Sequence, residues 1–166
     1  MSRSETRYQM SKAFDVAKNF FNGLRGKGAG VDIDVATAVM IPLVAAMLAD
    51  GYVLEEELLQ IHSICTTSPI FERNSQAENE YLISYATKII EDEGMANACA
   101  LSARVLTPAL RETAFVQAAR VIYSDGYVAR LEQEVLDQMT DWLGIDHERA
   151  HMMVEVVSIM QHPATA

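Results

Sequence analysis

The stretch from Val35 to Ala49 limits the possible folds of this chain more than any other segment. Its fifteen residues are apolar except for Thr37, and Pro42 is the one residue among them that disfavours a regular helix. A helix that is hydrophobic on every side has to be buried, and fifteen residues fall short of the roughly 20 needed to cross a bilayer. We therefore expect a buried central helix with the remaining elements packed around it.

Apolar residues recur at helical spacing through the rest of the chain, and no segment makes a convincing strand. Only 8 Gly and 4 Pro occur among the 166 residues, and half of the residues are hydrophobic, which is enough for one full core. Capping and turn residues divide the pattern into expected helices at about 34–49, 54–65, 75–91, 94–105, 107–124 and 129–143, with a last helix capped by Asp146. We predict an all-α, single-domain helical bundle of about seven to eight helices.

Residues 1–30 differ from the rest of the chain in pattern. Met10, Phe14, Ala17 and Phe21 follow one another at spacings of four, three and four, which predicts an amphipathic helix over about 4–24. Glycines then alternate with other residues up to position 30, as in a flexible linker. The expected organisation is a basic amphipathic helix and Gly-rich linker over 1–30, followed by a helical domain over 31–166. The helix has two interpretations: it lies on an anionic membrane surface, or it packs on protein, which is slightly favoured.

The charge is also divided unevenly. Residues 1–30 carry a net charge of +4 and residues 31–166 a net charge of −14, which together make the −10 of the whole chain. An acidic domain disfavours nucleic acid as a partner and favours cations or basic protein surfaces. We therefore expect protein partners and no nucleic acid, and a homo-oligomer remains open. No secretory signal is visible, so the protein is expected to be soluble and cytoplasmic.

One motif, D-G-Y-V-x-x-x-E, occurs twice, at 50–57 and at 125–132, with an offset of 75 residues. Each copy lies between a hydrophobic helix and an amphipathic one, so the repeat predicts two related halves, each a helix, a DG turn and a second helix. The glycine of each copy suits the left-handed position after a helix end. The four residues that follow the two glycines are expected to be core residues that fix the turns: Tyr52, Val53, Tyr127 and Val128.

The acidic residues of the two copies are the candidate metal ligands. An Asp at the carboxyl end of a helix is badly placed, because the helix end already carries partial negative charge. Backbone amides can compensate, or a bound cation can. Asp50, Glu57, Asp125 and Glu132 would form an oxygen cluster suited to Ca²⁺ or Mg²⁺, and Zn²⁺ is a third ion to test. In the alternative, each Asp is a cap and each Glu a solvated first-turn residue, while Arg130 neutralises the second copy. Both interpretations stay open.

The two copies and their flanks resemble the TerB family of tellurite-resistance proteins over about residues 36–155. The resemblance rests on A-x-x-x-A-D-G-Y-V-x-x-x-E in the first half, and on A-R-V-I-Y-S-D-G-Y-V-x-x-x-E with W-L-G-I-D downstream in the second. It implies an all-helical bundle of about seven helices whose acidic residues chelate metal, here Asp50, Glu57, Asp125 and Glu132. It also implies a non-catalytic role in resistance to tellurite and other stresses, within assemblies at the inner membrane.

A competing signal is the segment His147-Glu148-Arg149-Ala150-His151, which spells H-E-x-x-H. In zinc peptidases the two histidines bind Zn²⁺ and the Glu activates water. Here the segment falls at an expected helix start, charged residues surround it, and Glu155 and His162 are the only downstream ligand candidates. A small zinc hydrolase is therefore the least favoured function, and a solvated first turn is the favoured interpretation.

The sulfur-containing residues are expected to be structural. Cys65 and Cys99 form no CxxC pair and are predicted to be buried, reduced thiols. The last helix carries Met152, Met153 and Met160, which are predicted to fill the core.

Overall fold

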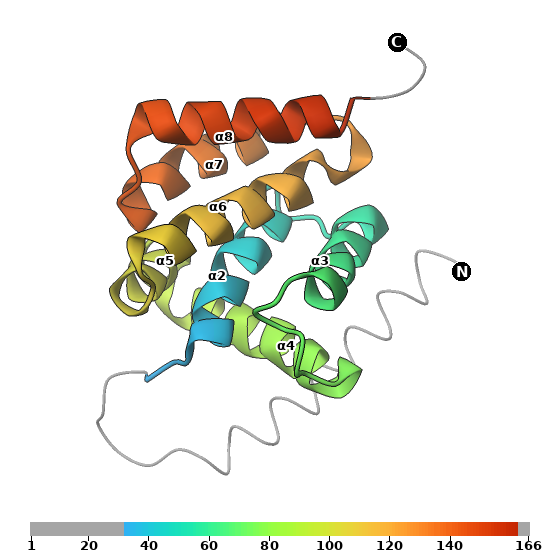
Figure 1. Cartoon of the computed structure of the whole chain (residues 1–166), viewed down its shortest axis with the longest axis vertical. Coiled ribbons are helices and arrows are strands. Elements are labelled where there is room, and N and C mark those ends of the chain that lie inside the picture. Colours follow the sequence, from blue (N-terminus) through green and yellow to red (C-terminus); the bar gives the residue numbers. More distant parts are fainter. Residues whose placement is uncertain (1–31, 163–166) are drawn as a thin grey trace.

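The computed structural model describes residues 32–162, so the predicted N-terminal helix and linker lie outside the described residues. Within this range the chain forms seven α-helices, one 3-10 turn and no strand, which confirms the predicted helical bundle (Figure 1). The elements are α2 (Val35–Met47), α3 (Glu55–Thr67), α4 (Gln76–Glu93), α5 (Met95–Val105), α6 (Pro108–Ile122), η1 (Tyr123–Asp125), α7 (Arg130–Leu143) and α8 (His147–Met160).

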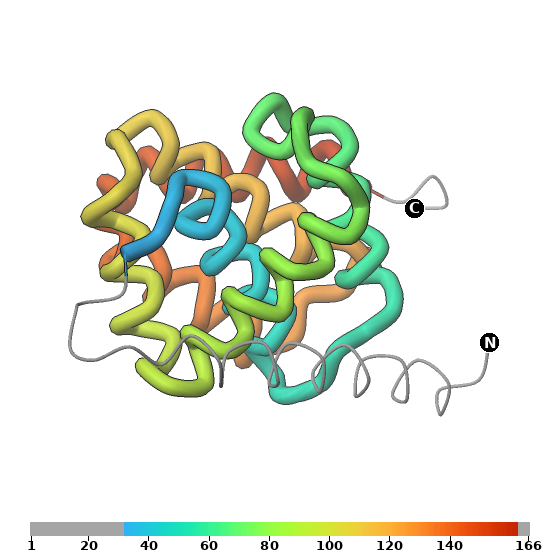
Figure 2. The backbone as a smooth tube through the Cα atoms, turned by 90° about the horizontal axis from the view of Figure 1, so that it is seen from below, coloured from blue at the N-terminus to red at the C-terminus, as the bar shows by residue number. Residues whose placement is uncertain are grey.

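Helix α2 is the buried central helix that its composition predicts. Every residue from Thr37 to Met47 is buried, and α2 packs against α3, α4, α5, α6 and α7. Figures 1 and 2 show it between α5 on one side and α3 on the other. Asp34 begins the helix by accepting a hydrogen bond from the Thr37 N–H at 2.8 Å. None of the described helices combines the length and the apolar composition needed to cross a membrane.

The expected helix boundaries hold to within a few residues, and the main differences occur at the two DG turns. Helix α2 ends at Met47 instead of Ala49, and α6 ends at Ile122 before the short 3-10 turn η1. In both places the α-helix stops before the glycine, because the glycine has a left-handed backbone conformation that an α-helix cannot include. The φ angle is +80° at Gly51 and +79° at Gly126. Thr107 and Asp146 cap the helices that follow them, as predicted.

The structure confirms the prediction for the cysteines and corrects the one for the methionines. Cys65 and Cys99 are buried and unpaired, and burial raises the pKa of Cys65 to about 11 and that of Cys99 to about 12. Met153 packs against the core, but Met152 and Met160 are exposed. The prediction for these two was wrong because α8 buries only one narrow face, at Ala150 and Val157.

The central position of α2 predicts where the fold is most sensitive to loss of side-chain volume. Replacing Leu43, which is fully buried, with Ala should lower the free energy of unfolding by about 2–5 kcal/mol. The matched control is Val35→Ala, since Val35 is exposed at the start of the same helix, and it should change stability by less than about 0.5 kcal/mol. Urea unfolding followed by circular dichroism measures both, and equal losses would contradict the central role of α2.

Candidate functional site

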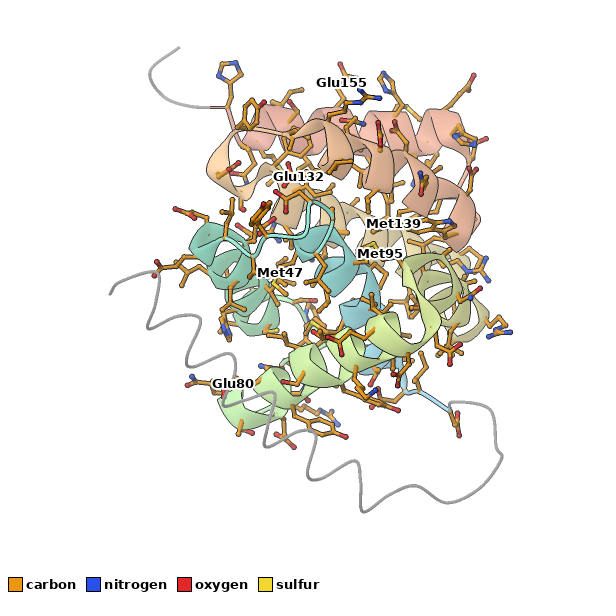
Figure 3. All side chains as sticks on the ribbon, turned by 180° about the vertical axis from the view of Figure 1, so that it is seen from behind. Met47, Glu80, Met95, Glu132, Met139 and Glu155 are labelled. Atoms are coloured by element: carbon orange, nitrogen blue, oxygen red, sulfur yellow. The ribbon has the colours of Figure 1, made fainter. Side chains whose placement is uncertain are left out.

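The two DG turns come together because the two halves of the repeat pack reciprocally. Each half begins with a helix before its DG turn, α2 in the first half and α6 in the second, and these two helices lie against each other. The helix after the first turn, α3, packs on α6 and η1. The helix after the second turn, α7, packs on α2. Figure 3 shows Glu132 on α7 beside the loop that leads into α3. The first residues of α3 and α7 therefore approach the turn of the opposite half.

The two turns have the same local geometry. The Asp50 Oδ1 atom accepts the N–H of Tyr52 at 2.9 Å, and Asp125 Oδ1 accepts the N–H of Tyr127 at 2.9 Å. Each Asp therefore closes a small turn with an amide two residues ahead, across the left-handed glycine. This is the amide partner that one interpretation of the motif expected, and it uses one carboxylate oxygen of each Asp.

The two glutamates are the most unusual residues of the motif. Glu57 Oε2 accepts the N–H of Leu54 at 2.8 Å, and Glu132 Oε2 accepts the N–H of Ala129 at 2.5 Å. Each Glu thus reaches back from the first turn to the residue that begins its helix. Their side chains are buried, with 2% exposure for Glu57 and 5% for Glu132. The alternative in which they are solvated first-turn residues is therefore wrong.

Burial and proximity disturb the protonation of both glutamates. Burial raises the pKa of Glu57 to about 7; the hydrogen bond from Leu54 opposes this, while the charges of Glu132, Asp50 and Asp125 add to it. Burial likewise raises the pKa of Glu132, against the hydrogen bond from Ala129 and with the charges of Asp50 and Asp125. Glu57 and Glu132 therefore lie near enough to Asp50 and Asp125 for the charges of the two aspartates to act on them, and we call these four residues the acidic neighbourhood.

No positive side chain within residues 32–162 forms an ion pair with any of the four carboxylates. The ion pairs in this range are Lys88–Asp92, Arg130–Glu134, His147–Asp141 and Arg149–Glu112. Arg130, expected to neutralise the second copy, instead binds Glu134 one turn further along α7 at 2.8 Å. Within the described part of the chain, backbone amides and not positive side chains therefore contact the four carboxylates.

Each of the four acidic side chains is directed at its own amide donor, and the four do not converge on one position. Among the described residues, no three His, Cys, Asp or Glu side chains are positioned to hold one metal ion. The hydrogen bonds that hold the two turns use only Oδ1 of each Asp and Oε2 of each Glu. The second oxygen of each carboxylate takes no part in these hydrogen bonds.

The tyrosines of the motif lie on the surface, against the prediction that they belong to the core. Tyr52 is 74% exposed and Tyr127 is 72% exposed, whereas Val53 and Val128 are partly buried against the core. The prediction was wrong for the tyrosines because the residue after each left-handed glycine lies in a surface turn. Two aromatic rings thus stand at equivalent positions beside the acidic neighbourhood.

Two polar atoms near the second turn were not singled out by the sequence. Arg120 Nε and Ser124 Oγ are the buried side-chain polar atoms of residues 32–162 that lack a hydrogen-bond partner. Arg120 lies in the last turn of α6 and Ser124 directly precedes Asp125. No sequence pattern could have marked them, because their burial arises only from packing between helices.

The H-E-x-x-H segment forms the exposed first turn of α8, as the favoured interpretation predicts. Asp146 caps the helix through the N–H of Arg149 at 3.0 Å, and His147, Glu148 and His151 are exposed. The His147 Nε2 atom lies 3.0 Å from Asp141 Oδ1. Glu155, a downstream ligand candidate, is exposed on the outer side of α8 (Figure 3).

The chain matches no protein-family model, and no curated protein or solved structure matches it.

The raised pKa of Glu57 predicts how stability depends on pH. The folded protein holds this proton more tightly than the unfolded chain, so its contribution to stability is lost as pH rises from 4.5 to about 7. Glu57→Gln keeps an acceptor for the Leu54 N–H and removes the charge. The variant should match the wild type near pH 4.5 and exceed it by on the order of 2 kcal/mol above pH 7, as measured by urea unfolding with a chelator present.

The control for this comparison is Glu155→Gln, which removes the same charge from an exposed position. It should show no such dependence on pH. A Glu57→Gln difference that stays constant across the pH range would mean that the pKa of Glu57 is the same in the folded protein as in the unfolded chain.

Proposed function

We propose that this protein is a non-enzymatic module that binds a divalent cation through Asp50, Glu57, Asp125 and Glu132 and acts as a scaffold. The observation that carries the proposal is the meeting of two buried glutamates and two turn aspartates with no positive partner in the described chain. Burying a carboxylate without a compensating charge costs several kcal/mol. A bound cation removes that cost at neutral pH, where a proton alone only partly does so.

The chemistry of the donors favours a hard ion. All four side chains offer carboxylate oxygen, and their second oxygens are not used by the hydrogen bonds that hold the turns. Oxygen ligands of this kind suit Ca²⁺ and Mg²⁺, and Zn²⁺ is the third ion to be tested. The ion would join the turn after α2 to the turn after α6, and so set the shape of the surface that carries Tyr52 and Tyr127.

The biological setting follows from the resemblance to the TerB family. This resemblance supports a role in a tellurite-resistance or general stress-resistance system. The protein would act in the cytoplasm, within a protein assembly at the inner membrane. The exposure of His147, Glu148 and His151 supports a non-catalytic role, because the H-E-x-x-H helix of zinc peptidases is usually buried and apolar around its ligands.

Titration calorimetry of the full chain with CaCl₂, MgCl₂ and ZnCl₂ tests the proposal. Asp50→Asn with Asp125→Asn keeps the Oδ1 acceptors for the Tyr52 and Tyr127 amides and removes two charges. We expect the wild type to bind Ca²⁺ or Mg²⁺ and the double variant to lose at least about 10-fold in affinity. Glu91→Gln with Glu155→Gln, both exposed, is the control with the same change in charge and should bind like the wild type.

Unchanged affinity in the double variant would remove these residues from the role. Absence of binding by the wild type for all three ions would overturn the proposal of a cation site altogether.

The exposed tyrosines favour a second candidate function, an acidic adaptor that binds basic proteins without a metal. Tyr is enriched at protein interfaces, and here two rings lie beside uncompensated carboxylates. An adaptor should show no thermal shift with divalent ions, and it should capture basic proteins in a way that salt disrupts. Tyr52→Ser with Tyr127→Ser should weaken that capture while leaving the affinity for divalent ions unchanged.

A further inference from the structure

The end of α7 and the start of α8 carry a second group of ligand-type side chains, separate from the four carboxylates of the DG turns. A cavity of about 380 Å³ is lined by Asp137 and Asp141 of α7 and by His147 and His151 of α8. Each pair is spaced by four residues, which places both members on one face of their helix. Two imidazoles therefore share one cavity with two carboxylates.

The closest contact in this group is an ion pair between the two helices, at a distance slightly shorter than that between two ligands of one metal. His147 Nε2 lies 3.0 Å from Asp141 Oδ1. A tetrahedral Zn²⁺ with bonds of about 2.0–2.2 Å holds neighbouring ligand atoms roughly 3.3 Å apart, so only a small widening admits an ion between these two atoms. His151 follows His147 by one helical turn, the arrangement in which an H-x-x-x-H pair chelates a metal.

We propose that this cavity is a binding site for a transition-metal ion, held by His147, His151 and Asp141 with water completing the coordination. Imidazole nitrogen with a single carboxylate selects Zn²⁺, Ni²⁺, Cu²⁺ or Co²⁺ over Ca²⁺ and Mg²⁺. Asp141 is preferred to Asp137 as the carboxylate ligand because Asp141 already contacts His147, whereas Asp137 is hydrogen-bonded to Gln133 on its own helix. The ion would link the end of α7 to the start of α8.

Forming the site requires side-chain movement but no change of fold. The three ligands are not gathered about one point in the described residues, so the His151 imidazole has to turn toward the His147–Asp141 pair. His147, His151 and Asp141 are all exposed, and rotamer changes of exposed side chains take only picoseconds to nanoseconds. The backbone that carries them is held by the Asp146 cap and by the bidentate Arg149–Glu112 pair.

Titration of the full chain with ZnCl₂ by calorimetry, and with CoCl₂ by visible absorption, tests this proposal. We expect one equivalent per chain and an intense tetrahedral Co²⁺ spectrum. His147→Ala, His151→Ala and Asp141→Asn should each weaken Zn²⁺ binding by about 10-fold or more. His62→Ala is the control for the number of histidines, and Glu148→Ala, on the same turn as His147, controls for local charge; both should bind like the wild type.

The outcome is independent of the carboxylate site at the DG turns. Loss of Zn²⁺ binding in Asp50→Asn with Asp125→Asn, with His147→Ala unaffected, would assign the ion to the carboxylates and overturn this proposal. Binding of several weak equivalents that no single variant changes would mean an adventitious ion only, and would overturn it as well. Because His147, His151, Asp141 and Glu148 are exposed, circular dichroism should show unchanged helix content in the variants at these four positions.

Discussion

The burial of α2 is the constraint on which the rest of the structure depends. A helix that is apolar on all sides gains stability only when other helices cover every face, at roughly 25 cal/mol per Å² of apolar surface removed from water. Five other helices do so, with α6 in the most extensive contact. Helices α2 and α6 each precede a DG turn of the repeat. Their packing against each other therefore also brings the two DG turns to the same region.

The acidic neighbourhood is a consequence of that packing. Each turn is satisfied locally, since one oxygen of every motif carboxylate accepts a backbone amide. Glu57 and Glu132 are nevertheless strained together, since both are buried and the charges of Asp50 and Asp125 act on both of them. A proton relieves this repulsion, so Glu57 couples the stability of the bundle to pH, and the proposed cation would couple it to ion concentration.

The molecule carries two groups of ligand-type side chains with different chemistry. The DG turns present only carboxylate oxygen, which suits hard ions, whereas the hairpin between α7 and α8 pairs imidazoles with carboxylates, which suits zinc-like ions. Helix α7 takes part in both, because Glu132 lies in its first turn and Asp141 in its last. An ion at either end would restrain the same helix, which makes α7 the element through which the two groups are mechanically connected.

The sequence alone determined the elements and their order. Continuous apolar character marked α2 as central, and capping residues such as Thr107 and Asp146 marked where helices begin, because both signals act over a few neighbouring residues. It also identified Asp50, Glu57, Asp125 and Glu132 as a set, through the repeat. Only the tertiary structure decided that Glu57 and Glu132 are buried, that Tyr52 and Tyr127 are exposed, that Arg130 binds Glu134, and that Met152 and Met160 face outward. Those outcomes depend on which helices lie beside each residue. Because these neighbours are far away in the sequence, the exposure of a side chain leaves no pattern in the residues around it.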